Sequence, residues 1–113
     1  MTGVATGRVD SAWAARLRRE LKAAPELAEA TSRFGSPGRL AWRCGTKEVA
    51  HLHAKPLVDI RLPKKARAEF AADPRLLPRA TRSDWIECRM ESADDAVFVA
   101  DLIRRAAKEA GRR

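Results

Sequence analysis

Long apolar runs are missing from this sequence. A membrane-spanning helix needs about 18 to 20 consecutive apolar residues, and no stretch of the chain approaches that length. The N-terminus also lacks the positive segment followed by a hydrophobic stretch that marks a secretory signal. We therefore expect no membrane partner and a protein that stays in the cytoplasm.

Cysteine is scarce. Only Cys44 and Cys88 are present, and they lie far apart, without the C-x-x-C spacing of zinc knuckles and redox pairs. We expect two buried free thiols, because unpaired cysteine is among the most buried residue types.

Large aliphatic side chains are also few. The chain has 113 residues, which is room for one domain, and its 45% hydrophobic content includes 22 alanines but only 22 leucine, isoleucine, valine and phenylalanine residues together. The core should therefore depend on three large side chains: Trp13, Trp42 and Trp85.

Acidic residues are outnumbered. The chain has 15 Asp and Glu against 23 Lys and Arg, a net charge of +8. Such an excess fits an anionic partner, either a nucleic acid, a phosphate-bearing ligand or an acidic protein. The basic residues are spread over nearly every segment, however, and arginine outnumbers lysine 17 to 6, as a GC-rich genome would also produce.

The apolar periodicity changes along the chain. Residues 1–9 have none and are expected to form a disordered leader, whereas a helix from Asp10 or Ser11 is predicted by residues that recur every four positions: Trp13, Leu17 and Leu21. The elements expected after it are a short helix at 27–30, strands at 40–44, 48–53 and 57–62, a helix at 63–72, an arginine-bearing loop at 73–82, a strand at 85–91 and a helix that starts at Ser92 and stops at Gly111.

These elements predict an α+β fold in a single domain spanning residues 10–111. Its sheet should be four-stranded and mostly antiparallel, with helices packed on one face and the order α-α-β-β-β-α-β-α. The oligomeric state is left open.

The predicted hairpin from Glu48 to Leu62 separates two kinds of side chain. If it pivots on Lys55, His51 lies opposite Asp59, because antiparallel partners sum to a constant. One face is then apolar: Ala50, Leu52, Val58, Ile60 and Leu62. The other face carries His51, His53, Asp59 and Arg61, joined by Trp85, Glu87 and Arg89 if the later strand lies in the same sheet.

This polar face supplies the candidate site. We expect a ligand to be bound by Glu48, His51, His53, Asp59, Arg61, Trp85 and Arg89. If the protein is an enzyme, the catalytic candidates are His51, His53 and Asp59, although the sequence places no activated serine or cysteine beside them. Arg61 and Arg89 either hold a carboxylate or phosphate of the ligand, or pair with Asp59 and Glu87.

A metal is the alternative use of the two histidines. An H-x-H pair on a strand places both imidazoles on one side, about 7 Å apart, and Asp59 would complete a two-histidine, one-carboxylate site. Histidines in this arrangement more often hydrogen-bond a neighbouring carboxylate, as His51 and Asp59 would. We therefore expect no metal, and the sequence indicates no particular cofactor.

Several short strings together resemble the luciferase domain family of small bacterial proteins, over about two thirds of the chain: R-F-G at 33–35, A-W-R-C-G at 41–45, E-V-A-H-L-H at 48–53, V-D-I-R-L-P at 58–63 and S-D-W-I-E-C at 83–88. The resemblance implies an α+β domain that stands alone in bacteria, without an established luminescent reaction. The recurring motif is matched by Glu48, His51, His53 and Asp59.

Three functions follow from these observations. The first is binding of a small anionic or polar ligand on the His/Asp/Arg face, whose distinguishing sign is a concave pocket above His51, His53 and Asp59. The second is binding of a nucleic acid or an acidic protein through the basic clusters at 16–22, 64–67 and 104–113. The third is an oxygenase or luciferase-type enzyme.

Overall fold

The computed structural model describes residues 2–32, 39–53, 56–77 and 83–111, with the side chains of the first helix described from Ala12 onward. The elements in chain order are α1 (Thr2–Leu21), β1 (Ala28–Thr31), β2 (Leu40–Cys44), β3 (Lys47–Leu52), β4 (Leu57–Arg61), α2 (Lys64–Arg67), the 3-10 turn η1 (Ala68–Phe70), β5 (Leu76–Leu77), β6 (Trp85–Arg89) and α3 (Ala93–Gly111).

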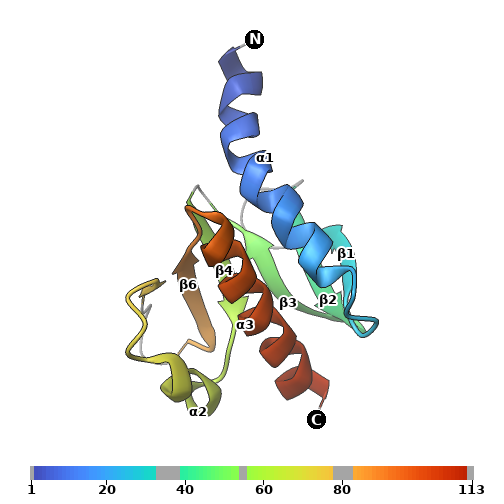
Figure 1. Cartoon of the computed structure of the whole chain (residues 1–113). Coiled ribbons are helices and arrows are strands. Elements are labelled where there is room, and N and C mark those ends of the chain that lie inside the picture. Colours follow the sequence, from blue (N-terminus) through green and yellow to red (C-terminus); the bar gives the residue numbers. More distant parts are fainter. Residues whose placement is uncertain (1, 33–38, 54–55, 78–82, 112–113) are drawn as a thin grey trace.

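The strands form one antiparallel sheet in the order β1-β2-β3-β4-β6-β5. Both long helices, α1 and α3, lie on one face of this sheet, where α3 packs against β2, β3 and β4 and α1 packs against α3 (Figure 1). The predicted α+β class and the antiparallel sheet with helices on one face are therefore confirmed. Among the described residues, no helix is both long and apolar enough to cross a membrane.

The core lies between the two helices and the apolar side of the sheet. Leu17 and Leu21 of α1 are buried there, as are Val99, Ile103 and Ala107 of α3, all as the periodicity predicted. The sheet contributes a buried set from its central strands: Trp42, Ala50, Val58, Ile60, Ile86 and Cys88. The same face of the hairpin that the sequence predicted to be apolar is thus the one that the helices cover.

The sheet has six strands, so the prediction of four was wrong. The segment predicted as a short helix at 27–30 forms β1, because four residues are too few for a stable helix and the outer edge of β2 offers backbone hydrogen bonds instead. The other addition, β5, lies in the segment predicted as a loop and pairs with the outer edge of β6. Both additions are edge strands.

Two helix boundaries also differ from expectation. The helix predicted at 63–72 is shorter and tightens into η1, which ends at Phe70. At the N-terminus, α1 begins at Thr2 rather than at residue 10, so it includes most of the segment that we expected to form a leader. The division of the chain into a leader and a single domain stays a prediction.

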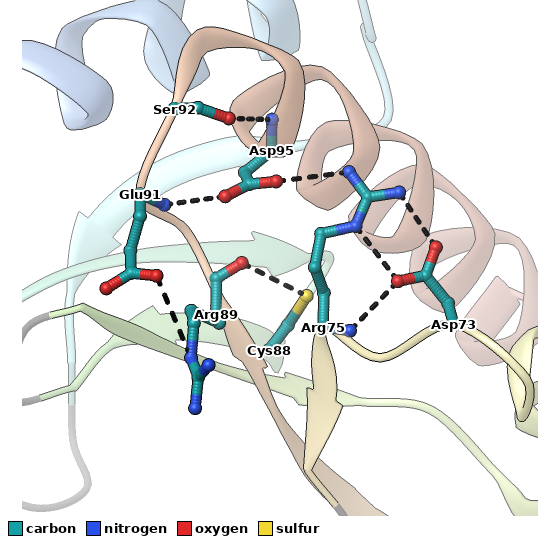
Figure 2. Close-up of polar contacts among 7 residues, drawn as sticks. All are labelled: Asp73, Arg75, Cys88, Arg89, Glu91, Ser92 and Asp95. Carbon is teal, nitrogen blue, oxygen red and sulfur yellow. Dashed lines mark hydrogen bonds and ion pairs between the residues drawn. The ribbon is translucent and has the colours of Figure 1, made fainter.

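Arg75 joins the segment before β5 to α3 (Figure 2). Its guanidinium donates to both oxygens of Asp73, at 2.9 and 2.7 Å, and to Oδ1 of Asp95 at 3.2 Å, and it lies 3.8 Å from the centre of the Phe98 ring. Asp95 also accepts the backbone N–H of Glu91 and donates its own N–H to the Ser92 hydroxyl, so Ser92 caps α3, the helix that was predicted to start at this residue. One side chain therefore connects the edge of the sheet to the start of α3.

The Arg75 ion pair predicts acid sensitivity. Hydrogen bonds from Arg75 lower the pKa of Asp73 below its ordinary value, so the stabilisation is present above about pH 4 and is lost as the pH falls through the folded-state value. We expect Asp73→Asn to lower the free energy of unfolding by about 0.5–1 kcal/mol at pH 7, because the pair is partly exposed to solvent. The difference from the wild type should become smaller as the pH is lowered from 7 to 3 in urea titrations.

A matched change, Glu26→Gln in the exposed turn before β1, should leave stability within about 0.5 kcal/mol at either pH. An Asp73→Asn difference of equal size at pH 3 and pH 7 would contradict an ionic origin.

The two cysteines are free, as predicted, but they differ in burial: Cys88 is buried on β6 and Cys44 is half-buried on β2. Burial raises the pKa of the Cys88 thiol to about 12, so almost no thiolate exists at neutral pH. In a Cys44→Ser variant, the remaining Cys88 should react with a colorimetric disulfide reagent only when the protein is unfolded in urea. Rapid labelling of that variant in its folded state would contradict the burial of Cys88.

Candidate functional site

A bulge in β3 places Glu48 beside His51. Trp42 pairs with Ala50 and Arg43 pairs with Glu48, so one step along β2 corresponds to two steps along β3, and Val49 is the extra residue. Strict alternation would put Glu48 and His51 on opposite faces of the sheet. The bulge brings them to the same face, where the Glu48 carboxylate lies 2.8 Å from Nδ1 of His51.

His51 lies between two buried carboxylates. The predicted register of the hairpin is confirmed, since His51 pairs with Asp59 across β3 and β4. Nε2 of His51 lies 2.9 Å from Oδ2 of Asp59, while its Nδ1 faces Glu48. All three side chains are buried, with 8% of the His51 side chain and 2% of each carboxylate side chain exposed.

His53 is the exposed member of the group. Its Nδ1 lies 3.1 Å from the same Asp59 oxygen that faces His51, and 42% of its side chain is exposed. Its Nε2 lies 3.9 Å from the carboxylate of Glu87 on β6. The two histidines and the aspartate therefore share one face, as predicted, and converge on a single oxygen atom.

Ser32 extends this chain of contacts inward. Its hydroxyl donates to Oε2 of Glu48 at 2.8 Å, and the residue is buried at the end of β1. No sequence pattern pointed to Ser32, because β1 was itself not predicted. We call this set of connected residues the polar cluster: Ser32, Glu48, His51, Asp59, His53 and Glu87.

The remaining predicted site residues lie around the polar cluster to different extents. The Trp85 ring lies 5.1 Å from the His51 ring, centre to centre, so it forms part of the cover over the cluster. In the backbone register of β4 and β6, Arg61 lies opposite Trp85 and Arg89 lies opposite Leu57. The two arginines are therefore at opposite ends of this strand pair. Four residues of strand separate the two arginines, or about 13 Å, and among the described residues neither contacts a histidine.

A hollow of about 110 Å³ opens at the hairpin end of the sheet, next to His53. Its walls are apolar and come from α1, β2 and the hairpin, while its polar groups are His53 and Arg39; the apolar residues include Trp13, Leu40, Leu52, Leu57 and Met90. The sequence predicted a pocket above all three of His51, His53 and Asp59. Only His53 borders the hollow, because His51 and Asp59 are buried behind it.

Both ring nitrogens of His51 face carboxylates. An ionised carboxylate only accepts hydrogen bonds, so a ring with one N–H can donate to Glu48 or to Asp59, and a ring with two can donate to both. His53, held by Asp59 and open to solvent, is the ring of the pair that a bound molecule can reach.

The comparisons with known proteins give one match. The sequence model of a family described as the Luciferase domain matches residues 46–106, which contain β3, β4, β6 and most of α3. No curated protein and no solved structure matches the chain.

The buried pairing of His51 predicts a large stability loss when one carboxylate is removed. Glu48→Ala leaves the Nδ1 side of His51 and the Ser32 hydroxyl without this acceptor, so we expect the free energy of unfolding to fall by about 3 kcal/mol in urea titrations. The control is Glu91→Ala, whose carboxylate is mostly exposed, with an expected change within about 0.5 kcal/mol. Equal effects of the two changes would show that the Glu48 contacts contribute little.

Proposed function

The chain belongs to the luciferase domain family, and we propose that it binds a small ligand that carries an anionic group on an apolar body. The observation that carries this proposal is the hollow at the hairpin end, where an exposed histidine fixed by Asp59 lies beside Arg39 within apolar walls. Concave apolar sites with a few polar groups are the usual form of small-molecule sites.

The polar side of the hollow favours an anion. Arg39 brings a guanidinium to it and His53 an imidazole ring, and no carboxylate among the described residues forms an ion pair with Arg39. A guanidinium that is already charged and close to an apolar surface binds a carboxylate or phosphate through charge-assisted hydrogen bonds. The ligand head group would thus lie between these two side chains.

The apolar side of the hollow favours a small body. Trp13, Leu52 and Leu57 provide flat and branched apolar surface, and the volume of about 110 Å³ suits a single ring or a short alkyl chain. Pockets for larger organic substrates span about 300–1,000 Å³. This size supports binding of a small acid and gives no support to a light-emitting oxidation of a large substrate.

Nucleic-acid binding has less support. Several arginines of the predicted basic clusters are neutralised by local ion pairs, as Arg16 with Glu20, Arg104 with Asp101 and Arg105 with Glu69 illustrate. Binding of nucleic acid depends on basic groups that replace counterions along the phosphate backbone. This alternative stays a prediction from the net charge.

Benzoate and its neutral analogue benzamide test the proposal. In ¹H–¹⁵N NMR titrations, benzoate should shift the Trp13 indole and the His53 backbone signals in a saturable manner, whereas benzamide should bind much more weakly. Arg39→Gln should weaken benzoate binding about tenfold or more, because hydrogen bonds to charged groups contribute about 1.5–3 kcal/mol.

Arg89→Gln is the matched control. It removes the same charge at a position on β6, outside the hollow, and should leave the affinity unchanged. Equal binding of benzoate and benzamide, or equal loss in the two arginine variants, would refute a specific anion site at the hollow.

A further inference from the structure

We propose that His51, His53 and Asp59 form a binding site for a divalent first-row transition-metal ion. One atom of each residue, Nε2 of His51, Nδ1 of His53 and Oδ2 of Asp59, points to a common region, and the candidate ligand atoms all lie within 4.8 Å of one another. The site does not depend on the ligand proposed for the hollow.

The spacing of these atoms suits a metal. The two nitrogens lie 2.9 and 3.1 Å from the aspartate oxygen. Ligands bound at about 2.0–2.1 Å in tetrahedral geometry are about 3.3 Å apart. Around an ion the two nitrogen–oxygen distances would therefore lengthen by a few tenths of an ångström, and rotation of the exposed His53 ring would adjust the distance between the two nitrogens, which is at most 4.8 Å.

Each histidine also has a carboxylate at its other nitrogen. Glu48 accepts from Nδ1 of His51 at 2.8 Å, and Glu87 lies 3.9 Å from Nε2 of His53. Metal-bound histidines almost always donate their second N–H to such a group, which fixes the ring and the tautomer. For His51 this support is itself held in place, because Ser32 donates to the same Glu48 oxygen.

Charge supports a cation at this position. Three carboxylates, from Glu48, Asp59 and Glu87, surround two imidazole rings, so the cluster can compensate a dication that binds in place of protons. Two imidazole nitrogens and one carboxylate oxygen suit zinc or iron(II) rather than magnesium or calcium, which prefer oxygen ligands. Three protein ligands leave a coordination position for water or a substrate group.

Isothermal titration calorimetry of the full chain with Zn²⁺ alone tests the proposal. We expect saturable binding at one site, a higher melting temperature with Zn²⁺ present, and visible absorption bands of low coordination number when Co²⁺ replaces Zn²⁺. Glu48→Gln should weaken Zn²⁺ binding about 10- to 100-fold, because it perturbs the support of His51. His53→Ala and Asp59→Asn should weaken it further.

Two control variants test whether Zn²⁺ binds outside the proposed site. Cys44→Ser removes the more exposed thiol, and Glu91→Gln removes an exposed carboxylate, so both should bind Zn²⁺ as the wild type does. Circular dichroism without metal verifies that each variant folds. If Asp59→Asn does not fold, His53→Ala decides the result, because it changes the exposed member of the cluster. Absence of saturable Zn²⁺ binding, or affinity unchanged by His53→Ala, would overturn the proposal.

Because the titration contains the metal and no organic acid, it separates this proposal from the one for the hollow. Zinc binding that is lost in His53→Ala but kept in Arg39→Gln would support the metal site alone. Loss of zinc binding in Arg39→Gln with full retention in His53→Ala would overturn it.

Discussion

The hydrogen bonds of one buried histidine constrain much of this fold. His51 lies between Glu48 and Asp59, and a polar group that is removed from water must find hydrogen-bond partners within the protein. Asp59 comes from the partner strand of the hairpin, Glu48 from a bulge in the same strand as His51, and the Ser32 hydroxyl that holds Glu48 from the edge strand beside β2. Three strands thus contribute to the contacts of one ring, and a slip in either ladder would separate His51 from these two carboxylates.

The two faces of the sheet are stabilised by different physics. On the helix face, α1 and α3 bury apolar side chains. Such packing tolerates substitution by apolar side chains of similar volume. On the opposite face, the polar cluster depends on the directions and lengths of its hydrogen bonds, so its side chains tolerate little substitution. At the β5 edge of the sheet, Arg75 links two elements through ion pairs. Its guanidinium contacts Asp73 before β5 and Asp95 at the start of α3, and it packs against the Phe98 ring.

How far the sequence could predict this structure depends on the range of the interaction concerned. The hairpin register followed from placing its turn at Lys55, because the two strands are close in sequence and antiparallel partners sum to a constant. The burial of His51 and the position of Glu48 did not follow, since a bulge adds one residue without any mark in the local pattern. β1 and β5 were missed because they are too short for a periodic signal and form only where a neighbouring strand has an open edge. Ser32 was missed because it follows β1, and Arg39 was missed because it lies before β2, outside the hairpin on which the predicted site was centred.

The region that matches the luciferase domain family does not contain the whole sheet. It begins at residue 46, after β1 and β2. Residues 46–106 contain Glu48, His51, His53, Asp59 and Glu87, and thus nearly the whole polar cluster. Trp13, Arg39 and Leu40, which form one side of the hollow, lie before this region. The matched region therefore holds most of the polar cluster, whereas one side of the hollow is formed by residues outside that region. Substitutions at Trp13, Arg39 or Leu40 would change the lining of the hollow without replacing any residue of the polar cluster.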